Sequence, residues 1–148
     1  MTARTIGVPL TLRERSEFIA AARSHLGVRF RHQGRSTRGV DCAGLVAVSF
    51  AAIGRTIEDC RAYGREPLNG KLRALLALNL GPPVDVGTMQ PADVVLMRFR
   101  GEPSHVGIVA DYPYDGLALI HSFAQVKKVV EHRIDSEWAS YIIEVFRP

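Results

Sequence analysis

Hydrophobic positions follow a helical spacing in the first half of the chain. Thr11 and Glu14 have the spacing of a capping box, and the apolar residues after them recur every three or four positions. After Cys42 the chain is apolar on nearly all sides of a helix until Gly54, a residue suited to a left-handed helix cap. This pattern predicts helices over residues 12–26, 42–53 and 71–80. The second of them should be central and buried.

The second half of the chain changes to a period of two. Five short segments are rich in β-branched or aromatic residues and are separated by turn residues: 93–99, 105–111, 117–123, 128–134 and 141–146. A short helical turn is expected around residues 135–139. Helices followed by a run of strands predict an α+β fold, in which N-terminal helices, including the one that begins at Cys42, pack on a C-terminal antiparallel sheet.

Two stretches carry neither period. Residues 29–40 are rich in Arg, Gly and Ser, so we expect a surface loop that leads into the cysteine segment, and residues 55–70 should be irregular. The sequence has no internal repeat and no interdomain linker, and 148 residues are enough to bury one core. We therefore expect a single domain over residues 1–148.

The composition is that of a globular protein with a mild basic bias. Hydrophobic residues make up 47% of the chain and charged residues 23%, and the net charge is +4. This charge favours anionic partners such as cell-wall polymers, nucleic acid or acidic membrane surfaces. The basic residues are scattered and are not interleaved with aromatic residues, so we expect no binding of nucleic acid.

The sequence also predicts no signal peptide, no membrane span and no disulfide bond. Residues 1–10 contain no apolar run of signal-peptide length, and no later stretch reaches the roughly 18 residues that a membrane span requires. We expect synthesis in the cytoplasm without a signal peptide, and no membrane span. Two cysteines, Cys42 and Cys60, are too few for a disulfide framework, so both are predicted to be free thiols.

Cys42 is the candidate nucleophile. It stands where a polar loop turns into an apolar helix, and the unpaired N–H groups and the helix dipole at such a position lower the pKa of a thiol. His105 and His121 lie on neighbouring predicted strands, and the alternation of side chains could put both imidazoles on one face. If the helix packs on that face, with Gly107 leaving room for it, the sulfur comes within reach of His105. The three residues then have the logic of a catalytic triad, and the N–H of Cys42 could help bind an oxyanion.

The other polar candidates have simpler interpretations. Asp41 is expected to cap the helix with its carboxylate, although it also lies next to the nucleophile. Cys60 lies in a polar context and is predicted to be incidental. The remaining histidines, His25, His32 and His132, are predicted to be solvated or to lie in loops, with His32 on the loop that edges the site.

Two other chemistries fit the sequence less well. Cys42, His105 and His121 could ligate zinc with water as the fourth ligand, but no short-spaced pair of ligands anchors such a site. Residues 64–72 have glycines and a lysine as in a phosphate-binding loop, but the glycine spacing is one residue too long. A proline also interrupts this segment, and a leucine takes the place of the Ser or Thr that would hold magnesium. The segment is predicted to be a turn before a helix.

Motifs along most of the chain recur together in one enzyme family. They lie at residues 29–34, 40–46, 89–95, 104–109 and 120–122. With this combination the chain resembles the NlpC-type cysteine peptidases, which are papain-like enzymes of peptidoglycan. It is more closely similar to their phage-associated branch, which accompanies tail assembly.

The resemblance implies a papain-like fold and a set of roles. Cys42 would be the nucleophile, His105 the general base and His121 the residue that orients the base. The candidate substrate-binding residues are Phe30, Asp41 and Ser104. The implied substrate is the peptide stem of the bacterial cell wall, cut between D-glutamyl and a diamino acid through an acyl-enzyme, without a metal or an organic cofactor. The implied location is the virion tail, acting at the host cell wall, with phage tail-tip proteins as partners.

The chain departs from the family pattern at three positions. Ala43 stands where serine is common, and Ala92 stands where a Pro-Gly-Asp motif has its glycine. Phe30 stands where tyrosine is common, which removes a hydroxyl that would face the substrate or the oxyanion. Two alternatives stay open: an amidase or acyltransferase on the same scaffold, and a structural tail-assembly protein with a weak or inactive peptidase fold.

Overall fold

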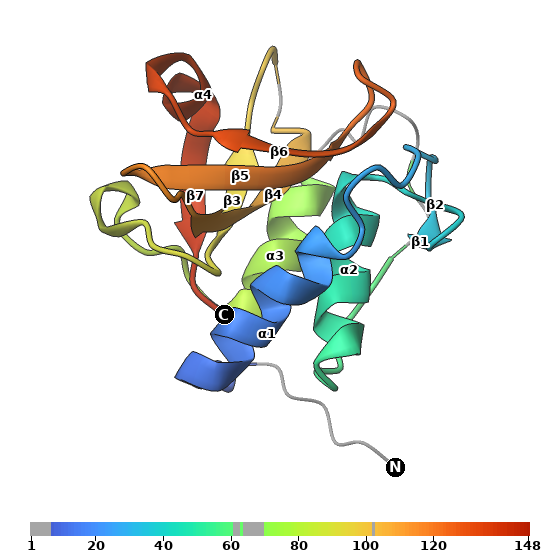
Figure 1. The fold of residues 1–148 in the computed structure, drawn as a ribbon. Coiled ribbons are helices and arrows are strands. Elements are labelled where there is room, and N and C mark those ends of the chain that lie inside the picture. The colour runs from blue at the N-terminus through green and yellow to red at the C-terminus, as the bar shows by residue number, and fades with distance from the viewer. Residues whose placement is uncertain (1–6, 61–62, 64–69, 102) are drawn as a thin grey trace.

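The computed structural model of the protein describes residues 7–60, 63, 70–101 and 103–148. Four α-helices lie within these residues: α1 (Leu12–Arg23), α2 (Cys42–Ala52), α3 (Lys71–Leu80) and α4 (Ser136–Tyr141), together with a short 3₁₀ turn, η1 (Val86–Thr88) (Figure 1). Thr11 and Glu14 form the capping box that the sequence predicts, since each side chain accepts a hydrogen bond from the other residue's N–H. The predicted helices are confirmed, although α1 ends at Arg23 instead of residue 26.

The strands form one antiparallel sheet and a small hairpin. The hairpin joins β1 (Arg35–Ser36) to β2 (Gly39–Val40), within a segment that the sequence predicts to be loop. The sheet has the order β6-β5-β4-β3-β7, with bounds β3 (Val94–Met97), β4 (His105–Asp111), β5 (Leu117–Phe123), β6 (Lys128–Arg133) and β7 (Ile142–Phe146). The predicted α+β class, with N-terminal helices on a C-terminal antiparallel sheet, is confirmed.

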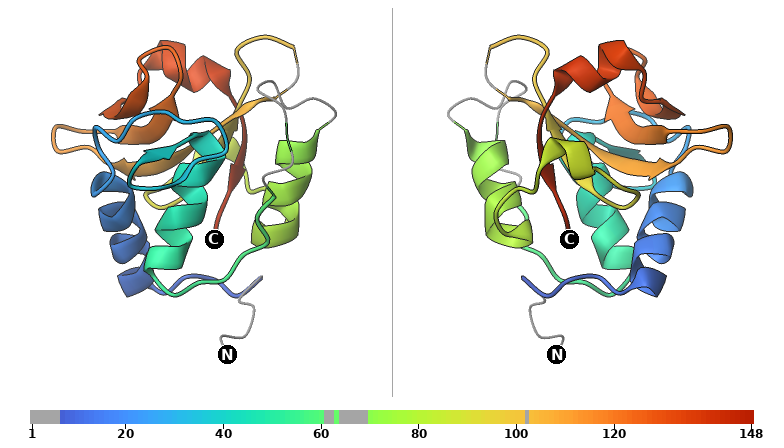
Figure 2. Two further views of the ribbon diagram at one scale, coloured as in Figure 1. Left: turned by 90° about the vertical axis from the view of Figure 1, so that its right-hand side faces the viewer. Right: turned by 90° about the vertical axis from the view of Figure 1, so that its left-hand side faces the viewer.

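The two faces of the sheet have different covers. Helices α1, α2 and α3 lie side by side on one face, whereas α4 lies on the other (Figures 1 and 2). On the helix-covered face, Val106 and Ile108 of β4 join a buried cluster with Leu45 and Phe50 of α2. Since side chains alternate along a strand, the neighbouring residues of β4 point to the opposite face. That opposite face is called the α4 face below.

The start of α2 lies against β4 and β5. The helix contacts both strands, and the Ser122 hydroxyl of β5 donates a hydrogen bond of 2.7 Å to the carbonyl of Val40 in β2. The pairing of β4 with β5 covers Ile108 to Asp111 of β4. The first residues of β4 lie beyond that pairing, and one of them, Val106, lies beside Cys42 at the start of α2.

The turn before β3 holds a buried carboxylate. Asp93 is fully buried and accepts charged hydrogen bonds from Arg15 of α1 at 3.0 Å and from Arg147 at 2.9 Å. Burial of such a charge is tolerated because both oxygens are paired. The preceding Ala92 has a φ of 75°, in the left-handed region that favours glycine, which is the physical difference that the exchange of glycine for alanine makes in this turn.

Two further expectations concern the phosphate-loop-like segment at residues 64–72 and membrane-spanning helices. Residues 64–69 of the segment with phosphate-loop-like spacing lie outside the described residues, and α3 begins at Lys71, directly after Gly70. Within the described residues, no helix has both the length and the apolar character needed to cross a membrane.

Candidate active site

Cys42 is the first residue of α2. The helix starts there because the Asp41 carboxylate accepts a hydrogen bond of 2.7 Å from the N–H of Gly44 and thereby caps it, as the sequence predicts. The backbone N–H of Val106 on β4 lies near enough to the Cys42 sulfur to favour the thiolate and so to act against the rise of the Cys42 pKa. The sulfur therefore lies beside the residue that directly follows His105.

Asp41 is the centre of a buried network. Its carboxylate accepts hydrogen bonds from the N–H of Gln33 at 2.8 Å, from Arg35 at 2.9 Å and from the hydroxyl of Tyr63, in addition to the helix cap. A carboxylate has about four lone-pair positions, and four protein donors occupy them. These contacts indicate that Asp41 holds the start of α2 and the segment before it in position.

Three histidines form a hydrogen-bonded chain on the α4 face. His105 Nε2 lies 2.7 Å from His121 Nδ1, and His121 Nε2 lies 2.9 Å from His132 Nε2. At the far end, His132 Nδ1 lies 2.9 Å from the carbonyl oxygen of Arg133. The structure thus brings His105 and His121 together, and it adds His132, which the sequence analysis wrongly assigned to solvent or a loop.

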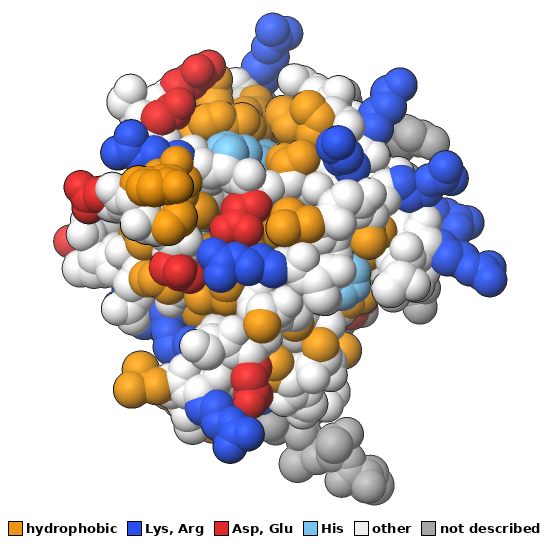
Figure 3. Space-filling model, in the orientation of Figure 1, with side chains coloured by type: hydrophobic (Ala, Val, Ile, Leu, Met, Phe, Trp, Pro, Cys, Tyr) orange, Lys and Arg blue, Asp and Glu red, His pale blue; other side chains and the backbone are white. Residues whose placement is uncertain are grey.

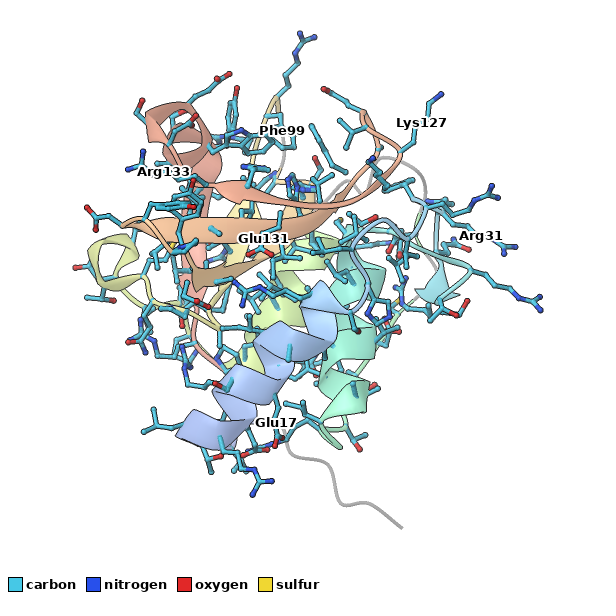
Figure 4. All side chains as sticks on the ribbon, in the orientation of Figure 1. Glu17, Arg31, Phe99, Lys127, Glu131 and Arg133 are labelled. Carbon is cyan, nitrogen blue, oxygen red and sulfur yellow. The ribbon has the colours of Figure 1, made fainter. Side chains whose placement is uncertain are left out.

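Aromatic side chains cover this chain. Trp138 of α4 lies 4.5 Å from the ring of His132 and 5.1 Å from that of His121, measured between centroids, and Phe99 lies 5.3 Å from the ring of His105. Phe99 extends over the sheet on the same side as α4 (Figure 4). In the space-filling view, histidine atoms are visible among hydrophobic side chains on this side of the molecule (Figure 3). The cover limits solvent around the histidines and restrains their rings.

Burial sets the protonation of the site. It lowers the pKa of His105 to about 4, and burial together with the neighbouring His105 and His132 lowers the pKa of His121 to about 2. Burial, followed by the charge of Asp41, raises the pKa of Cys42 to about 11, which outweighs the opposite effect of the Val106 and Ala43 N–H groups. The expectation of a lowered thiol pKa is wrong for the unliganded protein. The thiol of Cys42 and the imidazoles of His105 and His121 are therefore neutral at pH 7.

The packing of α2 also differs from the expectation. The triad hypothesis required α2 to pack on the face that carries the histidines, with Gly107 leaving room for it. Instead α2 packs on the opposite face, and a Cβ atom at Gly107 would lie 2.5 Å from Leu119 and 3.3 Å from the Cβ of His121. Gly107 makes room for side chains of β5. Cys42 lies at the start of β4, beside the backbone N–H of Val106.

A cavity opens next to Cys42. It has a volume of about 450 Å³, and its described lining is mainly apolar side chains of α3 with Cys42, Ala43, Cys60 and Tyr63. Cys60 is exposed there, and both cysteines are free thiols, as predicted. The partly exposed Cys42 can be approached from this cavity.

The proposed substrate-binding residues lie in different places. Phe30 is half-buried, pairs with Val40 and lines a separate surface hollow with Arg29, Arg31 and Lys127. Ser104 lies directly before β4, where its N–H donates to the carbonyl of Met97 at 3.2 Å. Contact of substrate with Phe30, Asp41 or Ser104 stays a prediction.

Sequence reasoning missed Tyr63 and the role of His132. Tyr63 comes 21 residues after Cys42 in a segment without periodicity, so no sequence signal connected it to Asp41. His132 could have been found, because a hairpin that pairs Phe123 with Lys128 puts His121 and His132 on one face. His32 does lie at the edge of the site, with its ring 5.5 Å from that of Tyr63.

The prediction for His25 is confirmed in part, because this residue lies in a turn after α1 but is not solvated. His25 is buried, and its Nδ1 bonds to the carbonyl of Ala21 at 2.9 Å. It lies at the end of α1, within a local turn. Among the residues that the structure describes, no group of three His, Cys, Asp or Glu side chains is arranged to hold a metal ion.

A central helix that begins at a cysteine and packs on an antiparallel sheet defines a papain-like α+β protein. Within this class the chain belongs to the NlpC/P60 family, whose model matches residues 27–147. The family includes cysteine peptidases and peptidoglycan hydrolases. No curated protein matches the chain.

Solved structures show the same fold at low sequence identity. An NlpC/P60 family protein from Bacillus cereus ATCC 10987 has a TM-score of 0.65 at 21% identity over 90% of this chain and 39% of its own. The NlpC/p60 domain of the peptidoglycan hydrolase SagA has a TM-score of 0.65 at 17% identity, over 90% of this chain and 98% of its own. The peptidoglycan hydrolase RipB from Mycobacterium tuberculosis has a TM-score of 0.64 at 21% identity, over 91% of this chain and 64% of its own. The chain thus spans well under half of the Bacillus cereus protein.

Proposed function

We propose that this protein is a peptidoglycan hydrolase that cleaves amide bonds of the cell-wall peptide stem by cysteine catalysis. The observation that supports this most directly is the arrangement at the sheet end. Cys42 begins a buried helix beside Val106, and the preceding His105 is hydrogen-bonded to His121. In this proposal Cys42 is the nucleophile, His105 the base and His121 the residue that orients the base.

The proposed reaction starts from the neutral pair. His105 Nε2 is engaged by His121, so Nδ1 is the nitrogen that can take the proton of the thiol as sulfur attacks the amide carbon. The resulting oxyanion collapses and expels the amine, which takes the proton from His105 and leaves a thioester on Cys42. Water then attacks the thioester and gives a proton to His105. When the acid product leaves, sulfur takes that proton back.

Digestion of purified peptidoglycan tests this proposal. Wild-type protein should release fragments with a new free amine in the stem peptide, and Cys42→Ala should lower the rate by about 10⁴-fold or more because the nucleophile is lost. Cys60→Ala is the matched control and should keep wild-type activity, because the exposed Cys60 takes no part in the proposed reaction. Mass spectrometry of the released termini identifies the bond, with cleavage between D-glutamyl and a diamino acid expected.

An amidase or acyltransferase on the same scaffold is the second candidate. The mainly apolar lining of the cavity beside Cys42 favours a substrate with an apolar group. Unchanged muropeptides, together with Cys42-dependent turnover of a fatty-acyl thioester or amide, would replace the peptidase proposal with this one.

We also propose that the protein acts from a phage or prophage tail at the host cell wall, in contact with tail-tip proteins. The support is the resemblance of its motifs to the phage-associated branch of the family. Mass spectrometry of purified particles should detect the protein, and particles carrying Cys42→Ala should assemble but penetrate the wall poorly. Particles that need the protein for assembly, while wild-type protein never cuts peptidoglycan, would instead identify a structural tail component.

A further inference from the structure

The histidine chain extends one residue beyond the proposed catalytic set. His132 lies on β6, whereas His105 and His121 lie on β4 and β5, so the three rings run across three neighbouring strands. His132 is half-buried at the outer strand, and its Nδ1 faces the main-chain carbonyl of Arg133 at 2.9 Å. This last contact determines which nitrogen donates and which accepts in each hydrogen bond of the histidine chain.

A carbonyl oxygen can only accept a hydrogen bond, so His132 must carry its proton on Nδ1. A neutral imidazole has one N–H, which leaves His132 Nε2 as an acceptor for the Nε2–H of His121 at 2.9 Å. His121 Nδ1 is then an acceptor for the Nε2–H of His105 at 2.7 Å. His105 therefore carries its proton on Nε2, and its Nδ1, the atom proposed to accept the thiol proton, keeps its lone pair.

This direction of the hydrogen bonds requires each imidazole ring to be neutral. Burial lowers the pKa of both His105 and His121, so each carries a single proton near neutral pH. Trp138 lies against the rings of His121 and His132 and restrains them in the orientation that the hydrogen bonds require. Reversal of every bond would put a proton on Nδ1 of His105, which could then not accept one from a thiol.

We propose that His132 is a positioning residue, which selects the tautomer of His105 through His121 and so keeps Nδ1 of the base free for Cys42. This inference rests on the proposed function, in which Cys42 and His105 react. His132 does not touch the reacting atoms. It supplies the acceptor that determines the direction of the chain.

Three substitutions at His132 separate this role from packing alone. His132→Gln can still accept from His121 through its amide oxygen and should keep the wild-type tautomers and rate. His132→Leu removes the acceptor, so His105 and His121 should each populate both tautomers and kcat should fall. His132→Arg can only donate, which favours the reversed chain, and should lower kcat by roughly 10²–10⁴-fold with little change in KM.

The direct measurement is NMR of the ring nitrogens in ¹⁵N-histidine protein at pH 7. In the wild type, His105 and His121 should be protonated at Nε2 and unprotonated at Nδ1. Arg133→Leu is the matched control, because only the main-chain carbonyl of Arg133 takes part and its exposed side chain can be changed without loss of that acceptor. Thermal unfolding of each variant checks that the fold is intact.

NMR of the ring nitrogens and the peptidoglycan assay together distinguish failure of the His132 proposal from failure of the proposed function. If the wild-type tautomers are as described and change in His132→Leu and His132→Arg, but no variant or wild type cuts peptidoglycan, the tautomer control stands and the proposed substrate is wrong. If folded His132→Leu and His132→Arg both keep the wild-type tautomers, or if the wild type has Nδ1–H on His105, the proposal for His132 is overturned.

Discussion

The two faces of the sheet are built from the same strands but have different chemistry. On the helix-covered face, alternate residues such as Ile108 and Ile120 join an apolar cluster with α1 and α2. On the α4 face, the residues between them include His105 and His121, hydrogen-bonded to one another under aromatic rings. Alternation along β4 and β5 therefore divides stability and candidate chemistry between two sides of one layer.

The two faces are stabilised by different kinds of interaction. The helix-covered face gains from apolar contact, which is non-directional and needs only complementary volume. The α4 face places imidazoles in a poorly solvated position, which is costly unless every ring nitrogen has a partner. Within the described residues, no buried side-chain nitrogen or oxygen lacks a hydrogen-bond partner. We expect the first face to determine stability and the second to determine pH response and reactivity.

The largest expected effect is on the helix-covered face. Phe18 of α1 is fully buried and packs on Phe50 of α2 with ring centroids 4.4 Å apart. Phe18→Ala should lower the free energy of unfolding by about 3–5 kcal/mol, because it leaves a cavity in the core. Urea unfolding should show a smaller loss for Trp138→Ala on the α4 face, since Trp138 is only half-buried. Equal losses would contradict the division between the faces.

Acid should destabilise the α4 face specifically. The pKa of His105 is about 4 in the folded protein and about 6.5 in the unfolded chain, so below pH 6.5 the unfolded state binds more protons. The free energy of unfolding should therefore fall as pH falls from 6.5 to 4, by about 3 kcal/mol from this residue. His105→Gln should lose less over the same range, measured by urea unfolding at each pH. Parallel curves for the two proteins would show that His105 is not the source.

The thiol of Cys42 should react slowly in the unliganded protein. A pKa of about 11, raised from 9.0 by burial, leaves roughly 100-fold less thiolate at pH 7 than an ordinary thiol has. Alkylation of Cys42 by iodoacetamide should be slower than that of free cysteine by about this factor and should rise steadily with pH. Cys60→Ser removes the second thiol from the measurement. A fast reaction that is constant between pH 5 and 8 would instead indicate a preformed thiolate–imidazolium pair.

The smallest effect is expected at Gly107, which lies on the α4 face between side chains of β5. A methyl group at Gly107 would overlap Leu119 and approach His121, so Gly107→Ala should lower the free energy of unfolding by about 1–3 kcal/mol. It should also lower activity by displacing His121. Gly87→Ala is the control, because its new methyl would meet only Asp85 at 3.4 Å, an ordinary contact. Denaturant unfolding of both variants should show a loss for Gly107→Ala alone.

Much of the fold and part of the site could be predicted from the sequence. The bounds of α3, β4 and β5 match the predicted segments residue for residue, because helical and strand periods are local properties of the chain. The cap of α2 by Asp41 was also predicted, since it depends on residues three positions apart. The single domain over residues 1–148 and the catalytic roles of Cys42, His105 and His121 stay predictions.

Local patterns in the sequence thus predict the helices, the strands of the main sheet and their order, whereas the pairing of Cys42 with the strand histidines stays a prediction. Tertiary packing determines which face α2 covers, because the alternation of side chains defines two faces of the sheet but does not specify which one a helix packs on. It also decided that His132 joins His121, since this depends on the register of a hairpin, and that Tyr63 reaches Asp41. The raised pKa of Cys42 has the same origin, because desolvation depends on the atoms that surround the sulfur and not on its position in a helix.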